Sequence, residues 1–131
     1  MIYAFLLLFM GCTFFNSNEK YIEKDYHDNG KIKYEIEKKN NLIHGFAKSW
    51  DENGILINEV EYFNDTLHGF WKEYYKNENL KYSVSYHYGL KDGYEYWFYE
   101  NGKKKSETSY NIGEIQGDII RWNKDGDLIY K

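Results

Sequence analysis

Short segments in which apolar and charged residues alternate recur along this chain, and turn-forming residues separate them. Residues 31–38, for example, read KIKYEIEK. Alternation with a period of two predicts β-strands with one covered face, and no segment shows the three- and four-residue spacing of a helix over ten residues. The pattern predicts ten strands, at 21–26, 31–38, 45–50, 55–62, 69–74, 79–86, 93–98, 103–110, 117–122 and 127–130.

The whole pattern returns every 24 residues from about residue 21 to the end of the sequence. Such a period is typical of repeat arrays, in which each unit stacks on the next. It predicts an all-β protein, an elongated antiparallel β-meander of about 4.5 stacked β-hairpin repeats over residues 21–131. The period is kept by two series of glycines, interpreted as structural turns, and by one series of aromatic residues: Gly30, Gly54, Gly102 and Gly126; Gly45, Gly69, Gly93 and Gly117; Tyr26, Trp50, Tyr74, Phe98 and Trp122.

Two classes of turn alternate along the array. The first ends in Asn-Gly or Asp-Gly, where glycine accepts the positive φ that closes a hairpin. The third unit has Asn77-Glu78-Asn79 instead, so this turn is expected to be the most strained or bulged. The second class places residues that tolerate left-handed backbone 24 residues apart, at Asn41, Asp65, Gly89 and Gly113.

An even repeat length keeps each position on the same face from unit to unit if both hairpin loops hold an odd number of residues. Even-numbered strand positions would then form one apolar face and odd-numbered positions a charged one. Three-residue loops would set Trp50 opposite Leu56, and would form the further pairs Phe46–Val60 and Phe70–Val84. Trp50 and Val60 are therefore expected on the same face.

The N-terminus carries a nine-residue apolar run, IYAFLLLFM, followed by Gly11 and Cys12. The run is too short to span a bilayer but fits the apolar core of a secretory signal peptide. The residues before Cys12 resemble a bacterial lipobox, which implies a signal peptide at 1–11, lipid attachment at Cys12 and a short tether at 12–20. A lipid-anchored protein of the bacterial cell envelope is the resulting prediction, and a secreted or periplasmic protein with an unmodified cysteine is the alternative.

The amino-acid composition narrows the classes of molecule that the protein is expected to bind. Aromatic residues make up 21% of the chain and proline is absent, which suits long hydrogen-bonded strands. The formal net charge of −4 disfavours nucleic acid, whose phosphates require a basic surface.

The sequence offers no reaction centre. His44 and His68 occupy equivalent sites about 10 Å apart by strand counting, which is too far to share one metal ion. The 21 carboxylates alternate with lysines as in a solvated ladder, and no serine or threonine has the setting of a nucleophile. The chain is therefore predicted not to be an enzyme and to use no metal, no cofactor and no small-molecule substrate.

Aromatic side chains on the charged face are the candidate partner-binding residues. Trp71 and Trp97 would project there, with Ile57 opposite Trp71 and Lys105 opposite Trp97. Tyr75 and Tyr99 would continue the same face beyond each strand. Exposed aromatic residues among polar ones are enriched where proteins dock, although cross-strand packing that only stiffens the sheet is the alternative.

With these elements assembled, the units resemble MORN repeats, specifically the bacterial variant form. The segments YFNDTLHGFWKEYYKNENLK (62–81) and YHYGLKDGYEYWFYENGKKK (86–105) carry the resemblance best, with Tyr62, Tyr86 and Tyr110 opening each unit. Lys38 departs from the pattern, as do Asp92 and Gln116, which replace the histidine of the His-Gly step. The resemblance implies a β-hairpin array used for association with proteins or membrane surfaces, and many bacterial members are labelled YwqK-type antitoxins.

These observations predict a non-catalytic repeat scaffold that mediates protein–protein interaction at a bacterial membrane surface, with an unknown protein partner and a membrane contact through its lipid anchor. The alternative is an antitoxin or immunity-type protein that neutralises a partner toxin by stoichiometric binding.

Overall fold

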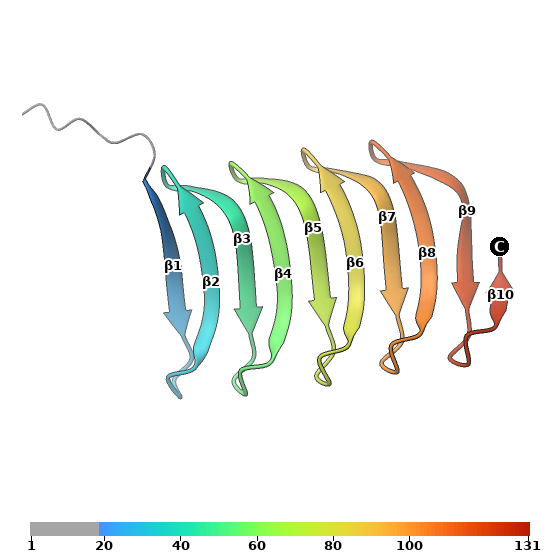
Figure 1. Cartoon of the computed structure of the whole chain (residues 1–131), viewed down its shortest axis with the longest axis horizontal. Helices are drawn as coiled ribbons and strands as arrows, with labels where there is room; N and C mark the ends of the chain where they lie inside the picture. Colours follow the sequence, from blue (N-terminus) through green and yellow to red (C-terminus); the bar gives the residue numbers. More distant parts are fainter. Residues whose placement is uncertain (1–18) are drawn as a thin grey trace, which may run out of the picture.

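A computed structural model describes residues 19–131, which form one open antiparallel sheet (Figure 1). Each strand pairs with the next in chain order, without crossovers. The predicted all-β meander is therefore confirmed, whereas the predicted signal peptide and Cys12 lie outside the described residues. The strands are β1 (Lys20–Tyr26), β2 (Ile32–Lys39), β3 (Leu42–Trp50), β4 (Leu56–Phe63), β5 (Thr66–Tyr74), β6 (Leu80–His87), β7 (Leu90–Phe98), β8 (Lys104–Asn111), β9 (Glu114–Trp122) and β10 (Leu128–Tyr130).

Two-residue turns close the hairpins at one end of the sheet, at the top of Figure 1. Both residues of each turn have positive φ, for example Asn40 at 54° and Asn41 at 66°. This is the turn type whose twist matches paired strands. The predicted left-handed positions at Asn41, Asp65, Gly89 and Gly113 are confirmed. Because two residues suffice, β3 begins at Leu42, three residues earlier than the glycine pattern suggested.

Five-residue turns close the opposite end, and four of them hold glycine at the position of positive φ: Gly30, Gly54, Gly102 and Gly126. The third unit keeps the same turn with glutamate in that place. Glu78 has φ of 66°, and its backbone N–H donates to the Tyr75 carbonyl at 2.9 Å, as that of Gly54 does to Asp51. Glu78 therefore carries the backbone strain that the irregular sequence predicted.

Replacing Glu78 by glycine is expected to stabilise the protein. A non-glycine residue in left-handed backbone costs about 1–2 kcal/mol, so Glu78→Gly should raise the free energy of unfolding by about 1 kcal/mol after the entropy of glycine in the unfolded chain is subtracted. Denaturant unfolding measures this difference. The reverse substitution Gly102→Glu, in the same turn one unit later, is the matched control and should destabilise; a destabilising Glu78→Gly would contradict the strain argument.

A bulge beside each five-residue turn shifts the register, and this makes the predicted face assignment wrong. Trp50 lies opposite Leu56 as expected, but Ser49 pairs with Asn58, so Ile57 is an extra, unpaired residue on β4. Beyond the bulge Val60 therefore pairs with Ala47 rather than Phe46. Because one inserted residue reverses the alternation, Trp50 and Val60 lie on opposite faces.

The same bulge recurs in the next hairpin, where Val84 pairs with Trp71 and not with Phe70. Both faces of the sheet consequently carry aromatic side chains, and the prediction of one apolar and one charged face is wrong.

The second glycine series lies inside strands and not in turns, which corrects the interpretation of Gly45, Gly69, Gly93 and Gly117 as turn glycines. These residues have φ between 71° and 115° in β3, β5, β7 and β9. Each follows the two-residue turn at a second irregularity of the register, such as that between Ile36 and Lys38. Glycine is needed there because the strand bends through backbone that side chains rarely adopt.

No second layer packs on the sheet within residues 19–131, so the core is thin and lies at the centre of the array. Val84 is completely buried and Tyr82 is 6% exposed. We call the face that carries them the tyrosine face; its residues include Tyr34, Tyr62, Trp71, Tyr82, Val84, Tyr86, Glu95, Trp97 and Tyr110. The opposite face, the ladder face, carries Lys24, Glu35, Lys48, Glu59 and Lys72 in one row across five strands.

Candidate interaction surface

Aromatic rings pack against one another in the middle of the tyrosine face. The rings of Tyr82 and Trp97 lie 4.4 Å apart between centroids, and Trp71 meets Tyr82 edge-on at 6.3 Å. Tyr82 is buried beneath this group, whereas Trp97 is 38% exposed. The arrangement presents one large aromatic side chain to solvent on a rigid, buried support.

The register changes the neighbours predicted for the candidate residues. Trp71 lies opposite Val60 and Val84, not Ile57, and Trp97 lies opposite Tyr82 and Ser106, not Lys105. Trp71 is partly buried, with a valine opposite it on each neighbouring strand. Ile57 remains an exposed candidate because the bulge leaves 43% of it accessible.

Tyr75 and Tyr99 hold neighbouring units together. The Tyr75 hydroxyl donates to the Phe98 carbonyl at 2.8 Å, and the Tyr99 hydroxyl donates to the Trp122 carbonyl at 2.9 Å. His27 makes the corresponding contact with the Trp50 carbonyl at 2.9 Å. Each of these hydrogen bonds joins residues 23 positions apart in neighbouring units. Both tyrosines therefore stabilise the array, in addition to any contact with a partner.

A buried charged group, which the sequence interpretation missed, lies next to this aromatic cluster. Glu95 is 9% exposed and accepts hydrogen bonds from Lys91, from the Tyr82 hydroxyl at 2.7 Å and from the Tyr110 hydroxyl at 3.2 Å. Burial opposes ionisation, but the hydrogen bonds from Lys91 and Tyr82 outweigh it and hold the pKa of Glu95 below its usual value. Glu95 is therefore a buried carboxylate at neutral pH.

The ladder face is held by exposed and half-buried ion pairs. Glu59 accepts from Lys72 at 3.2 Å and from the Tyr74 hydroxyl at 3.1 Å, and lies 3.5 Å from Lys48. Burial and the Glu59 carboxylate raise the pKa of Tyr74 to about 12. These contacts lock neighbouring strands side by side, but such pairs stabilise only weakly in water.

The sheet has two edges formed by turns, one by the two-residue turns and one by the five-residue turns, and these edges differ in polarity. Exposed apolar side chains, which we call the turn ridge, lie at and beside the two-residue turns: Phe63, Tyr88, Leu90 and Ile112. Histidine rings pack against this ridge, with His68 at 4.8 Å from Tyr88 and at 5.3 Å from His87 between centroids, and with His44 at 5.0 Å from Phe63. The five-residue turns at the other end are rich in Asn, Asp, Glu and Lys.

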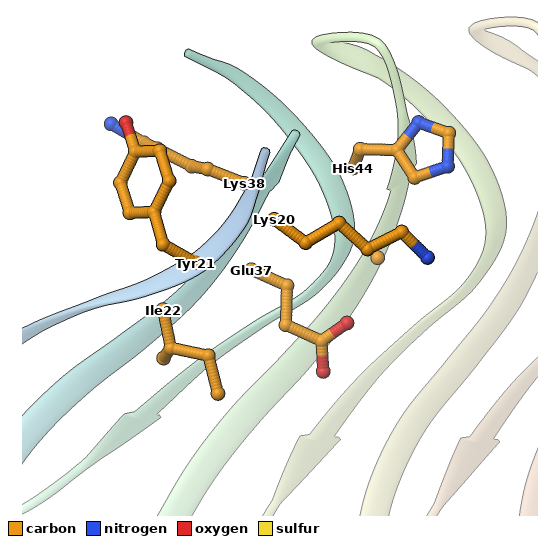
Figure 2. A pocket seen from close by; sticks show the side chains of 7 residues that line it. Lys20, Tyr21, Ile22, Glu37, Lys38 and His44 are labelled. Carbon is orange, nitrogen blue, oxygen red and sulfur yellow. The ribbon is translucent and has the colours of Figure 1, made fainter. Parts of the chain in front are cut away.

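A cavity of about 440 Å³ lies along the edge strand β1 (Figure 2). Tyr21 and Lys38 point to one side of β1 and β2, and Ile22 and Glu37 point to the other. The lining mixes single apolar and charged side chains with His44 and Gly45.

Within residues 19–131, no group of three or more His, Cys, Asp or Glu side chains is arranged to hold a metal ion. In the same region, no helix has the length and apolar character needed to cross a membrane.

Repeated hairpins in a single antiparallel layer define the class of β-repeat scaffold proteins. The model of the MORN repeat variant family matches residues 22–40, 43–64, 67–88 and 91–111, more than half of the chain. This protein belongs to the MORN repeat variant family. No curated protein and no solved structure matches the chain.

Proposed function

We propose that this protein is a non-catalytic scaffold that binds another protein at a bacterial membrane surface, where a lipid on Cys12 anchors it. The exposed Trp97 ring on its buried Tyr82 support is the observation that carries the binding proposal. Tryptophan and tyrosine dominate the energetics of protein interfaces when a rigid surrounding holds them in place.

The surroundings of Trp97 also suit a protein interface. Ser106 and Arg121 follow Trp97 in the same row of the sheet, and Glu73 flanks Tyr82 on the other side. These polar groups would form the rim around an aromatic centre. Ile57 is a second, smaller contact at the bulge, and Tyr75 and Tyr99 line the neighbouring turn end.

Removing Trp97 is expected to weaken partner binding without unfolding the sheet. An interface hot spot contributes about 2 kcal/mol or more, so Trp97→Ala should lower the affinity for the partner by at least about tenfold. The partner would first be identified by cross-linking in cells and mass spectrometry, and the affinity then measured with purified proteins.

Tyr94→Ala is the matched control, because Tyr94 is 50% exposed on the ladder face of the same strand. Equal losses for both variants, or none for Trp97→Ala, would contradict the proposed surface. A toxin recovered as the partner, with growth rescue on co-expression, would assign the antitoxin function. Mass spectrometry of the mature N-terminus tests acylation of Cys12.

A further inference from the structure

The two edges of the sheet that are formed by turns differ in their exposed side chains. At the two-residue turns Tyr88 is 58% exposed, Leu90 47% and Ile112 61%, and Phe63 lies beside them at 41%. Large apolar side chains that project from successive turns are costly in water unless something covers them. The five-residue turns themselves hold no exposed large apolar side chain, although Tyr26, 56% exposed, and Leu128, 57% exposed, flank the first and the last of them.

The charge of the turns also differs between these two edges of the sheet. The five-residue turns at 27–31, 51–55, 75–79, 99–103 and 123–127 hold seven acidic and four basic residues, an excess of three negative charges. An anionic bilayer repels this end, since the surface potential of anionic lipids acts over about a Debye length. At the opposite edge, the two-residue turns hold one charged residue, Asp65, and Glu114 follows the last of them, so these turns carry less negative charge than the five-residue turns.

The chain enters the sheet at the end that carries the turn ridge. Lys20 pairs with Lys39, and the backbone N–H of Asn40 donates to the Glu19 carbonyl at 3.1 Å. The strand β1 therefore begins at the edge of the sheet that carries the two-residue turns, as Figure 1 shows. Glu19 lies seven positions after Cys12 in the sequence, a distance that an extended chain spans with at most about 25 Å, whereas the strands carry the polar turns about 30 Å farther away.

We propose that the edge of the sheet formed by the two-residue turns lies against a lipid bilayer, with the turn ridge in the headgroup region. This inference rests on the proposed membrane tether at Cys12. The tether joins at β1, and the ridge extends along the turns between β4 and β9, so two separate attachments hold the array parallel to the membrane. Aromatic and aliphatic side chains at turn tips suit this interfacial zone. Both faces of the sheet, including Trp97, stay open to a protein partner.

Photo-cross-linking of the full chain in bacterial cells tests the proposed contact. The probe p-benzoylphenylalanine is placed at Tyr88 or Ile112 in the ridge, and at Lys76 or Asn101 in the polar turns as matched exposed controls. Phospholipid adducts of the irradiated protein are quantified by mass spectrometry, and urea unfolding confirms that each variant is folded. We expect at least tenfold more lipid adduct from the ridge positions than from the controls.

Membrane fractionation separates the two proposals. If the chain remains in the membrane fraction but both ends give equal adducts, or the ridge cross-links to protein, the orientation is overturned and the tether stands. If the chain leaves the membrane fraction and forms no lipid adducts, the tether and the orientation both fail.

Discussion

Lys91→Ile should be among the most destabilising single substitutions in this protein, lowering the free energy of unfolding by about 3 kcal/mol at pH 7. The variant removes the cation that compensates the buried Glu95 carboxylate, whose side chain is 11% exposed. Two tyrosine hydroxyls remain as donors, but they do not neutralise the charge. Urea unfolding at neutral pH measures the loss.

The double variant Lys91→Ile/Glu95→Ile provides the control. Isoleucine occupies both equivalent positions in the fourth unit, as Ile115 and Ile119. Replacing both charges with apolar residues is often neutral or stabilising, so the double variant should be more stable than Lys91→Ile alone. Adding Tyr82→Phe removes the hydroxyl that would otherwise lose its acceptor, and should recover a further 1 kcal/mol or so. A double variant less stable than the single one would show that the pair is not a compensated buried charge.

Acidification should separate the wild type from Lys91→Ile. In the wild type the pKa of Glu95 lies below its ordinary value, so its contribution is present at neutral pH and is lost as the pH falls through that lowered pKa. Without Lys91, burial disfavours the charged carboxylate and raises the pKa. The difference in the free energy of unfolding between the wild type and Lys91→Ile should therefore shrink as the pH falls and Glu95 binds a proton. A deficit that does not change with pH would exclude a charge effect.

The repeat period and turn chemistry were enough to predict the strands, because each turn type imposes its own residues. Asn-Gly and Asp-Gly steps identify the five-residue turns, and paired left-handed residues identify the two-residue turns. The faces could not be predicted in the same way. Ile57 and Lys81 fit an ordinary alternating strand, so nothing in the local pattern marks them as the extra residue of a bulge.

The surroundings of the candidate binding residues were predicted only in part for a related reason. Trp97 and Ile57 are exposed, whereas Trp71 is partly buried beside two valines that the wrong register had placed elsewhere. The ion pair between Lys91 and the buried Glu95 was missed, although the repeat itself contains a signal for it. Positions equivalent to Lys91 hold Ile43, Leu67 and Ile115, and those equivalent to Glu95 hold Ala47, Trp71 and Ile119. When two repeat positions hold apolar residues in the other units and a lysine and a glutamate in one unit, the two charged residues indicate a specific polar contact.

Gly69→Ala should be strongly destabilising, with a loss of about 2–4 kcal/mol in the free energy of unfolding. Gly69 has φ of 96°, outside the region that alanine adopts without strain. A Cβ atom would also lie 1.9 Å from Oε2 and 2.4 Å from Cδ of Glu61, which packs across the strand. Both effects act in the middle of the array, where Gly69 pairs with Tyr86.

Gly117→Ala is the control at the equivalent position of the fourth unit. Gly117 has φ of 71°, close to ordinary left-handed backbone, and a Cβ atom there would meet open space. Its cost should be that of left-handed alanine alone, about 1 kcal/mol. In Gly69→Ala/Glu61→Ala the clash with Oε2 and Cδ disappears and only the Cβ of residue 61, at 3.1 Å, stays close, although the Glu61 carboxylate also stops accepting from the Phe70 N–H at 3.3 Å. Part of the stability should therefore return, and what remains reports the backbone strain. Equal costs at Gly69 and Gly117 would mean that Glu61 moves aside freely and that the strand bend tolerates a side chain, so glycine would be needed at this position only for its φ.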